Sequence, residues 1–117
     1  MTDIQKEMLA EAESIKTNLE EALHTAFKRM SYLAFDHAFF EERNLYYGSQ
    51  INLAEKHPMY KPDKPVEELK KEIENHISIQ NYYSKIAMDM DVLIKALEDA
   101  CDVAEKYKQH FVEDKDE

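Results

Sequence analysis

Glycine and proline are scarce in this chain of 117 residues, which contains one glycine and three prolines. Glycine-rich phosphate loops and nucleophile elbows need several residues with positive φ, so these architectures are excluded. Tryptophan is absent, and cysteine occurs once, which excludes an intrachain disulfide and a cysteine-rich zinc site. A single cysteine also fits a reducing compartment.

Long hydrophobic runs are missing as well. No stretch approaches the roughly 18 apolar residues that a membrane span requires. Residues 1–7 lack the basic and apolar segments of a signal peptide. Acidic residues outnumber basic ones by 25 to 15, and the formal net charge of −10 argues against a general nucleic-acid-coating role. We therefore expect a cytoplasmic protein of a microbe or of a phage-infected cell.

The helix-breaking residues that are present all fall within residues 48–65. They are Gly48, Pro58, Pro62 and Pro65. The flanking segments are rich in the helix-forming residues Ala, Leu, Glu, Lys, Met and Ile. We predict one all-α domain in which two long antiparallel helices, residues 4–47 and 66–112, are joined by a loop at residues 48–65.

The first segment has apolar or semi-polar side chains at steps of three and four, which is the period of a helix. This stripe consists of Ile4, Met8, Ala12, Ile15, Leu19, Ala22, Ala26, Met30, Leu33, His37, Phe40 and Tyr47. Thr2 and Gln5 have the spacing of a capping box at its start. Gly48 stands where a C′ glycine would end the helix.

The second segment follows a heptad pattern, with alternating steps of three and four. Its positions are Val66, Leu69, Ile73, His76, Gln80, Tyr83, Ala87, Met90, Ile94, Leu97, Cys101, Ala104, Lys108 and Phe111. Pro65 and the two acidic residues that follow Val66 are signals for a helix start. Residues 113–117 are predicted to form an acidic tail beyond the helix.

Both stripes are wider than the strict seam of a two-stranded coil, and residues 32–40 are apolar almost all round. We therefore expect self-association into a dimeric four-helix bundle or a larger ring. The expected interface residues are Phe35, Phe39, Phe40, His76, Gln80, Tyr83, Met90 and Leu97. A monomeric bundle of three or four helices, with a kink, is the alternative.

Motifs for metal binding and catalysis are incomplete. Glu21 and His24 form one Glu-x-x-His pair, whereas a di-iron bundle needs two. No serine has a histidine and an acid at a suggestive spacing. We predict no metal, no cofactor and no enzymatic activity. His76 and Gln80 lie at core positions of the heptad, and we interpret them as a polar layer that fixes the register of the helices.

Charge is distributed unevenly along the chain. Residues 43–71 carry six basic and four acidic side chains, whereas the remainder carries nine basic and 21 acidic ones. A mildly basic tip that also bears tyrosines can hold single-stranded nucleic acid or a nucleotide, with phosphates on Lys and Arg and bases stacked on Tyr. The residues expected to take part are Arg43, Tyr46, Tyr47, Lys56, Tyr60, Lys61, Lys64, Lys70 and Lys71. An ordinary solvated loop is the plain alternative.

One family resemblance emerges from residues 40–100. Leu45-Tyr46-Tyr47-Gly48 precedes a polar loop, and the later helix contains Leu69-Lys70-Lys71-Glu72-Ile73 and Leu97-Glu98-Asp99-Ala100. This layout resembles that of phage UvsY-type recombination mediators, which are small helical oligomers that load a recombinase onto single-stranded DNA. The resemblance implies that the stretch from Arg43 to Lys71 lies near DNA.

The sequence thus predicts a non-enzymatic, oligomeric helical binding protein, with an accessory role in phage-type nucleic-acid metabolism as its specific version. Two alternatives stay open. Regularly spaced Asp and Glu side chains can imitate the phosphate array of DNA, as in a small acidic phage inhibitor of a DNA-binding or defence protein. The turn Tyr46-Tyr47-Gly48 is similar to the aromatic-x-Gly turn of secreted WXG-like hairpin dimers, although tryptophan is absent.

Overall fold

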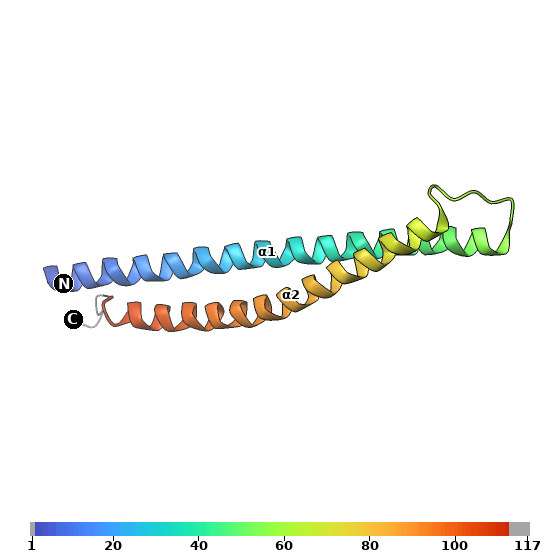
Figure 1. Cartoon of the computed structure of the whole chain (residues 1–117). Coiled ribbons are helices and arrows are strands. Elements are labelled where there is room, and N and C mark those ends of the chain that lie inside the picture. Colours follow the sequence, from blue (N-terminus) through green and yellow to red (C-terminus); the bar gives the residue numbers. More distant parts are fainter. Residues whose placement is uncertain (1, 113–117) are drawn as a thin grey trace. The chain divides into compact units, whose positions relative to one another are not determined.

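The computed structural model describes residues 2–112. These residues form an all-α helical hairpin, in which α1 (Asp3–Lys56) and α2 (Val66–Gln109) are joined by a loop at residues 57–65 (Figure 1). No β-strand occurs in this part of the chain. The predicted hairpin is confirmed, and the three or four helices of the alternative prediction are wrong for residues 2–112, where there are two. The expected acidic tail, residues 113–117, lies outside the described residues.

The start of α1 is a capping box, as the sequence predicts. The Thr2 backbone N–H donates to Gln5 Oε1 at 2.8 Å, and the Gln5 N–H donates to Thr2 Oγ1 at 3.1 Å. These two bonds occupy N–H groups that have no partner within the first turn of a helix.

The predicted end of the first helix at Tyr47 is wrong, because α1 continues through Gly48 to Lys56. Gly48 has no positive φ, so it is an ordinary helical residue here and not a C′ cap. Residues 49–56 contain no breaker and continue the helix. The helix ends just before His57 because Pro58 disfavours the α conformation in the residue that precedes it. The loop is therefore shorter than the 48–65 that we predicted.

The second helix begins at Val66, where the Pro65 signal places it. The Pro65 carbonyl accepts hydrogen bonds from the N–H groups of Glu68 (2.9 Å) and Leu69 (3.0 Å). The end of α2 differs slightly from the prediction, because regular helix stops at Gln109 instead of continuing to residue 112. Two bonds of the i→i+3 type follow it, which is the tightening common in a last turn.

Two compact units make up the described chain, and each is an antiparallel pair of helix segments. The terminal unit consists of residues 2–30 and 89–112, and the loop unit consists of Ser31–Met88. The buried apolar side chains of the terminal unit are Ala12, Ala26, Ile94 and Ala104, and those of the loop unit are Leu33 and Leu69. Of these six, only Leu69 is a large side chain that is fully buried.

The heptad predicted for α2 is confirmed at every position, because all fourteen side chains are buried or half-buried. The stripe predicted for α1 is wrong in its first part. Ile4, Met8, Ile15 and Ala22 are exposed, and the half-buried seam follows Leu9, Lys16 and Leu23 instead. No helix within residues 2–112 is long and apolar enough to cross a bilayer.

Candidate functional site

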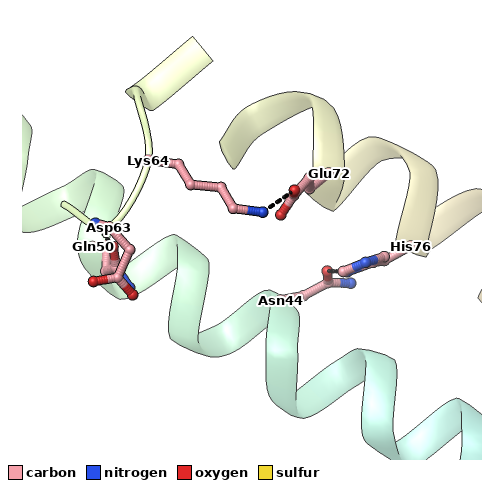
Figure 2. A network of polar contacts seen from close by, with 6 residues as sticks. All are labelled: Asn44, Gln50, Asp63, Lys64, Glu72 and His76. Carbon is pink, nitrogen blue, oxygen red and sulfur yellow. Dashed lines mark hydrogen bonds and ion pairs between the residues drawn. The ribbon is translucent and has the colours of Figure 1, made fainter. Parts of the chain in front are cut away.

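A buried glutamine fastens the loop to α1 within the loop unit. Gln50 is only 3% exposed, and its Oε1 accepts a hydrogen bond from the Asp63 backbone N–H at 2.8 Å. Its Nε2 donates to Asp63 Oδ2 at 2.9 Å, and Figure 2 shows the two side chains lying against each other. The Tyr46 hydroxyl donates to the same carboxylate oxygen, and this bond raises the pKa of Tyr46. The loop is thus held by polar contacts at its base.

A second polar cluster lies between the two helices of the loop unit. Asn44 Nδ2 donates to Gln80 Oε1 at 3.1 Å, so Asn44 Oδ1 is the acceptor for His76 Nδ1 at 2.9 Å (Figure 2). The Gln80 amide in turn donates to the backbone carbonyl of His37 at 3.1 Å. This arrangement supports the interpretation of His76 and Gln80 as a polar layer that fixes the register.

Most residues predicted for an interface between copies lie in the seam of the chain's own hairpin. The His76 ring lies 4.8 Å from the Phe40 ring and 6.0 Å from the Tyr47 ring, and Phe40 lies 6.3 Å from Tyr83. Gln80 belongs to the polar layer, and Met90 and Leu97 are half-buried on α2. Of this predicted set, Phe35 (69% exposed) and Phe39 remain exposed.

Two of the six basic side chains at the predicted tip form ion pairs with acidic neighbours. Lys64 forms an ion pair with Glu72, and their mutual hydrogen bond raises the pKa of Lys64 and lowers the pKa of Glu72 (Figure 2). Lys70 Nζ lies 3.9 Å from a carboxylate oxygen of Glu55 and 3.8 Å from one of Glu67. Glu55 and Glu67 belong to the acids already counted in residues 43–71, but Glu72 lies outside them, so the positive field of this region is smaller than the sequence count suggests.

Three residues of the predicted nucleic-acid set meet in one open pocket of about 450 Å³. Its lining consists of Phe39, Arg43, Tyr47, Lys64, Glu72, Asn75 and His76. The Arg43 guanidinium carbon also lies 5.3 Å from the centre of the Phe39 ring, which is a cation–π contact. Because Glu72 lies in the same pocket, the site presents both signs of charge.

The other predicted residues do not join this pocket. Tyr46 lines a smaller neighbour of about 240 Å³ with Phe39, Glu42 and Arg43. Lys70 and Lys71 line a third, together with Pro65, Glu67, Glu68 and Glu74. Lys56, Tyr60 and Lys61 are absent from the linings of all three.

An exposed apolar row on α1 was missed by the sequence reasoning. Its members are Tyr32, Phe39, Tyr46 and Leu53. They recur at intervals of seven residues, which bring side chains back to nearly the same face of a helix. The signal was present in the sequence, but the wider seam stripe of the same helix obscured it.

The terminal unit carries an apolar groove of about 520 Å³ between its two helix segments. Ile15 and Leu19 of α1 line one side. The α2 side consists of Ala96, Asp99, Ala100, Val103, Ala104 and Tyr107. Asp99 is the one charged residue of this lining, so the groove suits an apolar occupant.

Within residues 2–112, no three His, Cys, Asp or Glu side chains gather in a way that could hold a metal ion. Comparison of the chain with protein families, curated proteins and solved structures gives no match. The function proposed below therefore rests on the surfaces described above.

Proposed function

We propose that this protein is a non-enzymatic helical binding protein that self-associates through its exposed helix faces. The supporting observation is that exposed large apolar side chains outnumber the buried apolar ones. Within residues 2–112, six apolar side chains are buried, whereas nineteen large apolar side chains are exposed. Single exposed apolar residues are normal on any protein. Here they recur at helical spacing and surround a groove, as is typical of interaction surfaces.

Association also explains how so small a core supports such long helices. Most helix stability in proteins comes from packing of an apolar face, and not from intrinsic propensity. The terminal unit buries only three alanines and one isoleucine. Packing against another copy buries further apolar surface, and each Å² removed from water stabilises the folded state by about 25 cal/mol. Folding and assembly are therefore coupled in this proposal.

The test is thermal unfolding, followed by circular dichroism over a wide range of protein concentrations. Because association stabilises the folded chain by mass action, the midpoint temperature rises with protein concentration. A midpoint temperature that is independent of concentration overturns the proposal.

We keep nucleic-acid binding as a second candidate function, because Arg43, Tyr47 and Lys64 line one pocket that also has an aromatic wall. This candidate includes the mediator role that the UvsY-type resemblance implies, together with the cytoplasmic location expected from the sequence. Its test is fluorescence anisotropy with a labelled single-stranded oligonucleotide at about 50 mM salt. The expected result is binding that weakens as the salt concentration rises.

A matched pair of variants makes this test specific. R43A combined with K64A removes the two cations of the pocket, whereas K85A combined with K95A removes two lysines outside its lining. The first pair is expected to weaken binding more than the second. Absence of binding, or equal effects of the two pairs, overturns this candidate.

A further inference from the structure

We propose that the apolar groove of the terminal unit is the docking surface for a second copy of this chain, joined through the same face of each copy. This inference rests on the proposed self-association and names the surface responsible for it. It concerns only the terminal unit, where α1 and α2 contribute opposite sides of the groove.

The groove is lined both by large side chains that project from it and by alanines that leave space between them and a partner. Ile15, Val103 and Tyr107 are 49%, 63% and 44% exposed, so they stand out along it. Ala96 and Ala100 precede Val103 and Tyr107 on α2 and have no side chain beyond Cβ. Large side chains of one helix pack into the spaces between side chains of another. A surface with both features is self-complementary, as a two-fold symmetric dimer requires.

The apolar surface extends beyond the groove along each helix. Met8 and Ala22 lie seven residues on either side of Ile15, and Leu93 lies seven residues before Ala100. Residues at this interval share a helix face. With their exposed fractions, the large side chains of this face (Met8, Ile15, Leu93, Val103 and Tyr107) present roughly 500 Å² per copy, or about 1,000 Å² in a symmetric dimer, which is about the area that a specific interface should reach.

Charge argues against a nucleic acid at this face. Asp99 is the one charged residue in the lining, and no basic side chain accompanies it. The rest of the unit is acidic, because residues 2–30 and 89–112 contain seven basic and twelve acidic side chains. Two such units repel each other, and salt screens this repulsion. Self-association through the groove is therefore strengthened by salt, whereas binding to phosphates is weakened by it.

The experiment compares two isoleucines in the full chain by equilibrium sedimentation. Ile15 lines the groove, whereas Ile77 belongs to the loop unit and is exposed to a similar extent, at 47% against 49%. I15N is expected to weaken dimerisation by about tenfold or more, and I77N by less than about twofold. Both sites are exposed, so neither substitution removes a buried side chain from the hairpin.

The outcomes separate the docking surface from the self-association itself. If the wild-type chain associates and the two variants weaken association equally, or neither does, the groove is wrong while self-association stands. If the wild-type chain does not associate, both proposals fall. Repeating the wild-type measurement at higher salt gives a second criterion, since association that weakens with salt contradicts docking through this face.

Discussion

Gln50 and Asp63 are joined by two hydrogen bonds that use both polar atoms of one glutamine side chain. Gln50 belongs to the last turns of α1, and Asp63 lies in the loop three residues before α2 begins. The contact therefore ties the loop back onto the helix that precedes it. Because Gln50 is buried, water replaces these bonds poorly when either partner is lost.

Q50A is expected to lower the free energy of unfolding by about 1–3 kcal/mol, because the Asp63 backbone N–H loses its partner in a part-buried position. Urea denaturation measures the change. N81A is the control, since Asn81 is an exposed amide on α2 and is expected to change stability by less than about 0.5 kcal/mol. Equal effects of the two substitutions contradict a fastening role for Gln50.

N44A tests the polar layer between the helices. Asn44 bonds to both His76 and Gln80, so its truncation leaves a part-buried donor and a part-buried acceptor without their partner. We expect a loss of about 1–2 kcal/mol in the free energy of unfolding. N52A, at an exposed site of the same helix, is the control. A loss no greater than that of N52A rules out the layer as a source of stability.

G48A is expected to stabilise the hairpin. Gly48 is interior to α1, lacks a positive φ, and a Cβ built there meets no atom within 4 Å. Alanine is preferred to glycine in a helix interior by about 0.8–1 kcal/mol, which sets the expected gain in the free energy of unfolding. Serine is a better helix former than glycine, so S49A gains less. Destabilisation by G48A indicates that the helix does end at this point.

The ion pair between Lys16 and Glu105 predicts a response to acid. Their nitrogen and oxygen lie 2.7 Å apart, and this ion pair, followed by the hydrogen bond from Gln109, lowers the pKa of Glu105 below its ordinary 4.5. A lowered carboxyl pKa contributes stability above the ordinary pKa, and this contribution is lost as pH falls through the lowered value.

E105Q is therefore expected to be less stable than the wild-type chain at neutral pH and to converge with it at acidic pH. Midpoint temperatures measured from neutral pH to below 4.5 check this. E98Q, at an exposed site of the same helix, is the control and is expected to run parallel to the wild type. A constant difference between E105Q and the wild type across the range contradicts the ion-pair explanation.

The buried face of the second helix was predictable because its apolar residues follow a single heptad pattern. Every heptad position from Val66 to Phe111 is buried or half-buried. In the first helix, Ile15 and Lys16 are adjacent, and pattern reasoning assigns the seam to the isoleucine. The structure assigns it to Lys16, whose aliphatic stem packs in the seam while its ammonium group reaches Glu105.

Polar partners were harder to predict, because periodicity locates a face and not the atoms opposite it. His76 and Gln80 were identified as a polar layer, but Asn44, which connects them, was not. The tip was predicted as basic from sequence counts. Glu72 lies just beyond the counted stretch, and only the fold brings it to Lys64.

Equilibrium sedimentation of the wild-type chain at several concentrations decides whether these hairpins self-associate. One chain has a mass of 13.8 kDa. We expect a fitted mass that rises with concentration toward twice this value, because two terminal units cover each other's apolar face. A mass of 13.8 kDa at every concentration contradicts self-association.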